Sequence, residues 1–386
     1  MTTPEDGAAF QDPERVRALA TAIAQAVRPG KRYRFMEFCG GHTHAIGRYG
    51  LAGLLPEAVT LIHGPGCPVC VLPAGRIDAA LALAARPEVI LCSYGDLFRV
   101  PGSARRSMIS ARAEGADIRM VTSPLQAVTI ARDNPQRAVV FFAIGFETTA
   151  PASAAAIKAS LAAGLTNFHE LVCHVLTPPA MAAILAEEAT AATDVRPRLD
   201  GLIGPGHVAL ITGMAPFDRF AQSNGRPIAV AGFEPTDLLQ AVLALVTLTN
   251  EGAARAVNRY TRAVTEAGNT TAQALLNEVF EVKASAEWRG LGMVADSALA
   301  LRPAYARFDA EKRFPCDLPP PQVNRACRCP DILRGLIAPE DCALFGRSCT
   351  PSDPVGACMV SSEGACAAAY AYGGRRAATP LRRPQP

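Results

Sequence analysis

The chain has 386 residues, of which 49% are hydrophobic and 19% are charged, and its formal net charge is +3. This composition is typical of a folded protein and argues against disorder, and so small a charge gives no support for nucleic-acid or membrane-surface partners. No stretch reaches the roughly 18 continuous apolar residues of a membrane helix, and the acidic start is unlike a signal peptide, so we expect a cytoplasmic protein.

The predicted elements begin with an N-terminal helix within residues 1–30. After it, short apolar runs end repeatedly in glycine turns, with helical stretches between them. Continuous apolar strands are typical of a parallel sheet covered by helices, so the pattern predicts an α/β fold. The tripeptides GPG and GFE each occur twice, which hints at two similar parallel-sheet domains around a cleft, assigned to 31–125 and 126–235. Ligands in such folds bind at the carboxyl ends of the strands.

The rest of the chain divides into three predicted parts. Residues 236–310 are a helical connection, residues 311–372 are rich in Cys, Pro and Gly, and residues 373–386 are a flexible basic tail. Because the segment 311–372 lacks hydrophobic periodicity, we expect a small C-terminal domain organised around something other than a hydrophobic core.

The sequence CGGHTH places Cys39 after the first predicted strand, followed by Gly40 and Gly41 and then by His42 and His44. On an extended segment the two histidines would share a face. A histidine alone is more often a hydrogen-bonded structural side chain, but three soft or borderline ligands within six residues favour a metal or thiol site. The two glycines allow a sharp turn or a close approach to a ligand.

The sequence GPGCPVC places Cys67 and Cys70 after another predicted strand. Their spacing allows a disulfide or a dithiol with one lowered pKa, and the helix expected after them puts the pair near its positive end. The alternative is half of a zinc site. By contrast, Cys92 and Cys173 lie in apolar runs and are expected to be core residues. His207 lies within reach of the cleft but is assigned no catalytic role.

Twelve cysteines are present, and six of them lie between Cys327 and Cys366. Sets of four cysteines bind structural zinc or iron–sulfur clusters. Zinc sites usually contain two close pairs, whereas only Cys327 and Cys329 are close here, so the spacing favours a [4Fe–4S] cluster. The two extra cysteines are expected to form a redox-active pair, although spacing does not sort the six into ligands and pair. The alternative is a set of buried free thiols.

Five motifs together closely resemble one family: CGGHTH, GPGCPVC, IGFETTAP, GPGHV and CTPSDPVGACMVSSEGACAAAYAYG. By this resemblance, which covers residues 34–372, the chain is identified as a member of the HypD family of [NiFe]-hydrogenase maturation factors. The resemblance implies two α/β domains and a C-terminal [4Fe–4S] domain. It also implies a scaffold that assembles the Fe(CN)2CO centre with the chaperone HypC and the cyanide donor HypE, and that serves the hydrogenase large subunit indirectly.

The resemblance also assigns residues. Cys39 is the expected ligand of the nascent iron, and Cys67 and Cys70 match a redox-active pair facing the same cleft. His42 and His44 match the histidines of the family motif, with His44 favoured for a functional role. By analogy, the cluster ligands are Cys327, Cys342, Cys349 and Cys366, the adjacent thiol pair is Cys329 and Cys358, and Glu363 is a further candidate.

One departure from the family pattern is Pro330, where the family usually has glycine; proline removes an N–H group and restricts φ. The glycines after Cys39 are expected to leave room for the iron against the backbone.

We expect a maturation scaffold with redox activity rather than a turnover enzyme. Two other functions fit these residues: a stand-alone thiol–disulfide reductase fed by an iron–sulfur cluster, and a binding module stabilised by zinc. The sequence contains no Walker-type phosphate-binding loop, so it gives no support for an ATPase.

Overall fold

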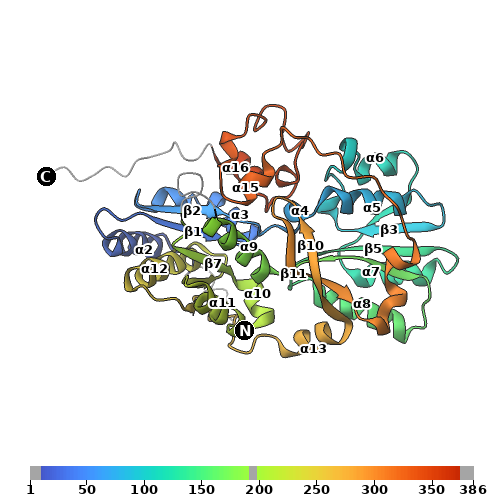
Figure 1. Ribbon diagram of the computed structural model, residues 1–386, viewed down its shortest axis with the longest axis horizontal. Coiled ribbons are helices and arrows are strands. Elements are labelled where there is room, and N and C mark those ends of the chain that lie inside the picture. Colours follow the sequence, from blue (N-terminus) through green and yellow to red (C-terminus); the bar gives the residue numbers. More distant parts are fainter. Residues whose placement is uncertain (1–9, 191–197, 374–386) are drawn as a thin grey trace.

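The computed structural model describes residues 10–190 and 198–373, and this part contains two parallel β-sheets, an antiparallel hairpin and a helical C-terminal segment (Figure 1). Sheet A has the strand order β2-β1-β7-β8-β9, and sheet B has the order β4-β3-β5-β6. Neighbouring strands are parallel throughout both sheets. The predicted α/β fold with two parallel-sheet domains is therefore confirmed.

The order of the strands in the chain differs from their order in space. The strands of sheet A are β1 (Tyr33–Glu37), β2 (Val59–His63), β7 (Gly201–Pro205), β8 (Ile228–Ala231) and β9 (Ala256–Asn258). Those of sheet B are β3 (Val89–Ser93), β4 (Ile118–Met120), β5 (Ala138–Gly145) and β6 (Phe168–His174). The chain leaves sheet A after β2, builds sheet B, and returns with β7. The segment 31–125 thus contributes strands to both sheets.

Helices connect the strands and cover both sheets (Figure 1). Around sheet A lie α2 (Pro13–Ala26), α3 (Gly40–Arg48), α10 (Gly206–Thr212), α11 (Ala215–Asn224) and α12 (Pro235–Glu251). Around sheet B lie α5 (Ala74–Ala84), α6 (Met108–Ala113), α7 (Pro124–Asp133) and α8 (Ala150–Ala162). The helix α9 (Thr177–Thr190) follows β6 and packs on α11. The helix predicted near the N-terminus is α2, which Asp12 caps through the N–H of Glu14. Among the described helices, none has both the length and the hydropathy that crossing a membrane requires.

A β-hairpin occupies part of the segment that we expected to be helical. After α12 and α13 (Thr270–Val279) come β10 (Phe280–Trp288) and β11 (Gly292–Leu301), which pair antiparallel. The sequence signal for this hairpin is the pair of glycines at the turn between the strands, Gly290 and Gly292, which have φ of +89° and +71°. Trp288 is buried at the hairpin end and its indole donates to the Ser297 hydroxyl at 2.9 Å. Pairing of the two strands and burial of Trp288 decide the structure here, although most of the hairpin is exposed or half-buried.

The C-terminal segment lies beside both α/β units (Figure 1). Its short elements are α14 (Ala310–Arg313), α15 (Cys329–Leu333), the 3-10 turn η6 (Ala357–Met359) and α16 (Ala365–Tyr372). Pro330 stands in the first turn of α15, where a missing N–H costs no helical hydrogen bond. α16 packs on α3, and η6 packs on α4 (Pro68–Val71). The predicted basic tail lies outside the described residues apart from Gly373.

One continuous cluster of buried side chains joins the two sheets, the hairpin and the C-terminal segment. It includes Phe38 from the end of sheet A, Phe142 from sheet B, Trp288 from the hairpin and Cys358 from the C-terminal segment. Each sheet has a further cluster of its own on its outer side. The shared cluster fixes the carboxyl end of β1 relative to the cysteine-rich segment, and this is where the candidate site lies.

Candidate functional site

Three neighbouring strands of sheet A bring the reactive side chains to one edge. β1 is flanked by β2 and β7, and Cys39 follows β1 directly after Phe38. Cys67 follows the GPG turn after β2, and His207 lies in the first turn of α10, after a second GPG whose Gly204 and Pro205 end β7. Because parallel strands end at the same edge, these two segments place a thiol and an imidazole on either side of Cys39. The two GPG copies therefore belong to one sheet and do not mark two similar halves.

The turn after β2 runs against the backbone of Cys39. The N–H of Gly40 donates to the carbonyl of Gly66 at 3.0 Å, and the N–H of Gly64 donates to that of Glu37 at 2.9 Å. A Cβ on Gly66 would lie 2.5 Å from the Cα of Cys39 and would overlap its nitrogen. Only glycine therefore allows this approach.

Cys39 is a buried thiol beside an imidazole. Its sulfur lies 3.6 Å from Nε2 and 3.8 Å from Nδ1 of His207, so it is not aligned with a single ring nitrogen. Burial, and then the negative charge of Glu37, raise the pKa of the Cys39 thiol well above its ordinary value. Burial, and then His42, lower the pKa of His207 to about 4. The pair is uncharged at neutral pH, and both groups are donors for soft or borderline metals once the thiol loses its proton.

Glu37 anchors this end of the sheet. Its buried carboxylate accepts the N–H of Cys39 at 2.8 Å, the hydroxyl of Thr43, and Nδ1 of His63 at 2.8 Å. Sequence reasoning missed Glu37 and His63 and gave His207 no role. A carboxylate inside the apolar run FMEFC was the available signal, because a buried acid needs partners to offset its desolvation.

His42 and His44 point in different directions because the segment after Cys39 is the helix α3, with Cys39 at its N-cap. The expectation that they share a face is wrong, since residues two apart on a helix lie on opposite sides. His42 is fully buried and its Nε2 lies 3.2 Å from the carbonyl of Ala231. His44 faces the C-terminal segment, with Nδ1 3.4 Å from the carbonyl of Ser362 and Nε2 3.4 Å from the hydroxyl of Tyr372.

The two glycines after Cys39 do not leave open space for an iron. A Cβ on Gly40 would lie 2.7 Å from Oε2 of Glu363, and one on Gly41 would lie 2.9 Å from the ring of Phe233. The glycines are needed because these two side chains fill the space. The structure thus places Glu363, a sequence candidate, next to the first turn of α3. Burial, then Asp96 and Glu37, raise the pKa of its carboxyl.

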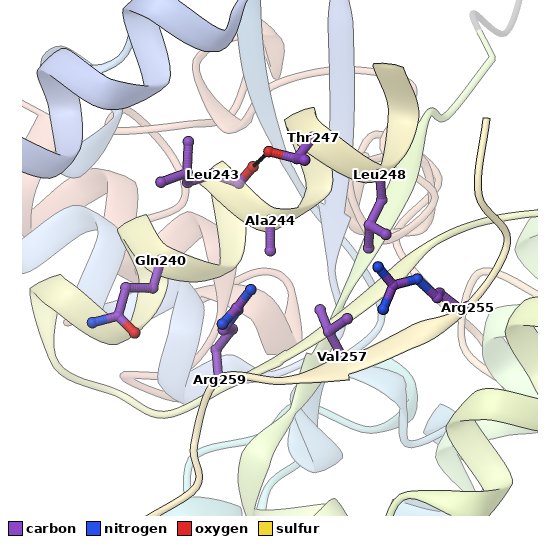
Figure 2. Close-up of a pocket in the computed structure, with 8 residues that line it drawn as sticks. All are labelled: Gln240, Leu243, Ala244, Thr247, Leu248, Arg255, Val257 and Arg259. Atoms are coloured by element: carbon purple, nitrogen blue, oxygen red, sulfur yellow. Dashed lines mark hydrogen bonds between the residues drawn. The ribbon is translucent and has the colours of Figure 1, made fainter. Parts of the chain in front are cut away.

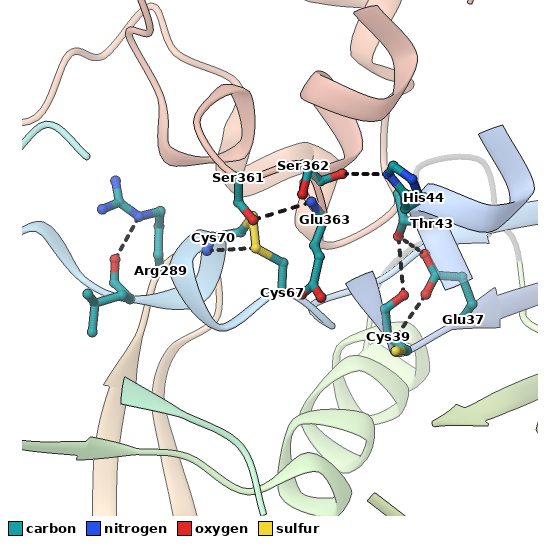
Figure 3. The surroundings of a disulfide bond; sticks show 11 residues. Glu37, Cys39, Thr43, His44, Cys67, Cys70, Arg289, Ser361, Ser362 and Glu363 are labelled. Atoms are coloured by element: carbon teal, nitrogen blue, oxygen red, sulfur yellow. Dashed lines mark hydrogen bonds between the residues drawn. A yellow bond between two sulfur atoms is a disulfide. The ribbon is translucent and has the colours of Figure 1, made fainter. Parts of the chain in front are cut away.

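Cys67 and Cys70 form a disulfide at the first turn of α4 (Figure 3). Both are buried, and the N–H of Cys70 lies 3.2 Å from the Cys67 sulfur. The loop with Ser361, Ser362 and Glu363 passes between this disulfide and His44 (Figure 3). The disulfide therefore lies between the carboxyl edge of sheet A and the cysteine-rich segment.

The C-terminal cysteines gather around Gly356. A Cβ on Gly356 would lie 2.5 Å from the sulfurs of both Cys327 and Cys329. Hydrogen bonds with the thiols of Cys329 and Cys366, followed by burial, raise the pKa of Cys358 well above its ordinary value. The charges of Cys327 and Cys329 also raise the pKa of Cys349, after burial. Cys327, Cys329, Cys349, Cys358 and Cys366 are thus close neighbours.

These thiols are a suitable donor set for an iron–sulfur cluster, and Gly356 keeps the space beside two of them free of a side chain. Within residues 10–190 and 198–373, no three His, Cys, Asp or Glu side chains are already arranged to hold a single metal ion. The division of the six cysteines into ligands and thiol pair stays a prediction.

A separate pocket of about 290 Å³ lies between α12 and β9 (Figure 2). Arg255 and Arg259 flank β9, on either side of Val257, and extend toward α12. Cysteine and histidine are missing from its described lining, which sets it apart from the site at Cys39.

Fold and site together define an α/β protein with a buried thiol–imidazole pair beside a disulfide and a cysteine-rich C-terminal segment. Residues 14–373 match the family model described as "HypD: Hydrogenase formation hypA family". The chain belongs to the HypD family, the hydrogenase maturation factors, and the prediction made from its motifs is confirmed.

Curated relatives agree over almost the whole chain. The hydrogenase expression/formation protein HupD of Azotobacter chroococcum mcd 1 is 57% identical over 370 residues, covering 96% of this chain and 97% of that protein. Hydrogenase maturation factor HypD of Azotobacter vinelandii is 56% identical with the same coverage. That of Escherichia coli K12 is 46% identical over 93% of this chain and 94% of its own length.

Proposed function

We propose that this protein is the scaffold on which the Fe(CN)2CO centre of a [NiFe]-hydrogenase is assembled, with Cys39 as the protein ligand of the iron. The supporting observation is the meeting of Cys39, His207 and the Cys67–Cys70 disulfide around three adjacent strand ends. Thiolate and imidazole suit iron, and thiolate ligation is compatible with the low-spin state that cyanide and carbon monoxide favour. The iron is the substrate that the scaffold assembles, and its other ligands, cyanide and carbon monoxide, do not come from the protein.

Iron capture at Cys39 is coupled to the loss of a proton. The free thiol is neutral because burial and Glu37 disfavour its thiolate. A ferrous ion supplies the positive charge that a buried thiolate otherwise lacks, so the ion binds as the proton leaves. The site thereby keeps Cys39 unreactive until its cargo arrives.

Cys67 and Cys70 provide the electrons for cyanide transfer. A cyanide bound to a carrier sulfur as a thiocyanate is released by two electrons and one proton, giving free cyanide and the carrier thiol. Oxidation of the Cys67–Cys70 dithiol to the disulfide supplies two electrons and two protons, and the second proton goes to solvent. The observed disulfide is then the spent form.

Re-reduction of that disulfide takes two electrons and two protons; the electrons would come one at a time from an external electron-transfer protein and pass through the C-terminal segment, which packs on α4 through η6. A [4Fe–4S] cluster, where bound, would pass single electrons and would be held by Cys327, Cys342, Cys349 and Cys366. Cys329 and Cys358 would be the intervening thiol pair, and both are buried. The partners are a HypC-type chaperone, a HypE-type thiocyanate carrier and, indirectly, the hydrogenase large subunit.

Infrared spectroscopy tests the iron assignment. The protein is purified anaerobically together with its HypC-type partner, and cyanide and carbonyl bands are expected from the complex. Cys39→Ala should lose these bands, whereas Cys316→Ala, which removes an exposed thiol, should keep them. Unchanged bands in the Cys39 variant would refute the assignment.

Replacing Cys67 or Cys70 by Ala tests the redox role. Hydrogenase maturation should stop while the cluster absorbance stays intact, and normal maturation would contradict the proposal. Metal analysis separates the alternatives: about four irons per chain excludes a zinc module. Turnover of a disulfide substrate without partner proteins would instead favour a stand-alone reductase.

A further inference from the structure

The second GFE motif places an aromatic ring between the histidines of the site. Phe233 follows β8, and its ring stacks on His207 with centroids 5.2 Å apart and an interplanar angle of 19°. The same ring lies 5.2 Å from the ring of His42, tilted by 37°. Gly41 makes room for it, since any side chain there would meet the ring. Phe233 therefore contacts both imidazoles near Cys39.

Phe233 is held in place from behind. A Cβ on Gly232 would lie 2.5 Å from the ring of Tyr260, whose own ring meets Phe233 edge-on at 6.0 Å. Asp237, in the first turn of α12, accepts the N–H of Glu234 at 3.2 Å and pairs with Arg262 at 2.5 Å. Phe233 thus follows a strand and precedes a capped helix, on a backbone with little freedom to move.

The imidazole of His207 is in contact with this ring along its face. Metal-binding histidines usually have their second ring nitrogen fixed by a carboxylate, a carbonyl or water. In the described structure, both ring nitrogens of His207 lie near the Cys39 sulfur, and neither has a hydrogen-bonding contact with any carboxylate or carbonyl. Ring stacking on Phe233 therefore takes the place of the usual second hydrogen bond.

We propose that Phe233 is a positioning residue for metal capture: it holds the imidazole of His207 against the sulfur of Cys39 so that both donors meet the incoming ion together. This inference rests on the proposed role of Cys39 as the iron ligand. Outer partners of metal ligands typically change metal affinity by about 10- to 100-fold, so an effect of that size is expected here.

The first GFE motif provides the matched control. Phe146 has the same neighbours in sequence, but its ring packs on Trp288 at 6.0 Å. Phe146→Leu therefore removes a buried ring from an equivalent turn of sheet B without touching His207. Its metal binding should equal that of the unmodified protein.

Cobalt(II) titration of the full-length protein under anaerobic conditions tests the proposal. The signal is the difference spectrum relative to Cys39→Ala, which removes contributions from the other thiols. Phe233→Leu should weaken cobalt binding about 10-fold and alter the ligand-field bands, while the thiolate charge-transfer band returns at saturation. Phe233→Tyr, which keeps the ring, should restore most of the affinity. Phe233→Met gives a second ringless variant if the leucine variant does not fold.

A double-mutant cycle separates positioning from general destabilisation. His207→Ala should weaken cobalt binding, and adding Phe233→Leu to it should cause little further loss, because Phe233 acts through His207. Additive losses, a tyrosine variant as weak as leucine, or unchanged binding in Phe233→Leu would each overturn the proposal. If Cys39→Ala binds cobalt like the unmodified protein, the proposed iron site itself fails, whatever Phe233 does.

Discussion

Gly66→Ala places a methyl group where the turn after β2 crosses Cys39. The new Cβ would lie 2.5 Å from the Cα of Cys39 and nearer still to its nitrogen and to the carbonyl carbon of Phe38. All three neighbours are backbone atoms, so no rotamer change relieves the overlap, and the turn must move by about 1 Å to restore van der Waals contact. We expect a loss of about 3 kcal/mol in the free energy of unfolding, the upper part of the overpacking range.

Urea denaturation measures this loss, and infrared spectra of the complex with the HypC-type partner report on the iron site. Because the displaced atoms belong to Cys39, the cyanide and carbonyl bands should weaken as well. Gly53→Ala is the control: its Cβ would have nothing within 4 Å, and its free energy of unfolding should change by less than about 1 kcal/mol. A Gly66 variant as stable as the Gly53 variant would refute the close approach.

Two other changes test the protein away from Cys39. Burial raises the pKa of Glu170 to about 8, whereas the ordinary value is 4.5, so the unfolded carboxyl ionises first and the free energy of unfolding falls as pH rises through this window. In Glu170→Gln the free energy of unfolding should fall less between pH 5 and 8, by up to roughly 4 kcal/mol, when measured by urea denaturation. An unaltered pH dependence in this variant would contradict the raised pKa of Glu170. Gly356→Ala would bring a Cβ to 2.5 Å from two cysteine sulfurs, so bound iron per chain and the cluster absorbance should fall. Gly75→Ala is the control, because its Cβ would lie 3.8 Å from its nearest neighbour, Pro321, and it should keep the iron content and the cluster absorbance. Equal iron content in the two variants would argue against a cluster beside Gly356.

The sequence predicts those features that depend on neighbouring residues. Continuous apolar runs ending in glycine turns indicated buried parallel strands, and helices such as α8 lie between strands, as the helical stretches of the sequence indicated. The C-x-x-C spacing allowed the Cys67–Cys70 disulfide that the structure contains. The hairpin β10–β11 shows where the approach fails, because its pairing and the burial of Trp288 depend on contacts with other parts of the fold.

The candidate site depends on distant segments. Cys39 and His207 are 168 residues apart and meet because β1 pairs with β7 in sheet A. Strand order is set by which apolar faces and backbone edges fit together in three dimensions, and a period-two or continuous pattern looks the same in either sheet. The sequence by itself therefore determined an α/β protein with reactive thiols at strand ends. Only the tertiary structure decided which imidazole faces Cys39, and which side chains fill the space over Gly40 and Gly41.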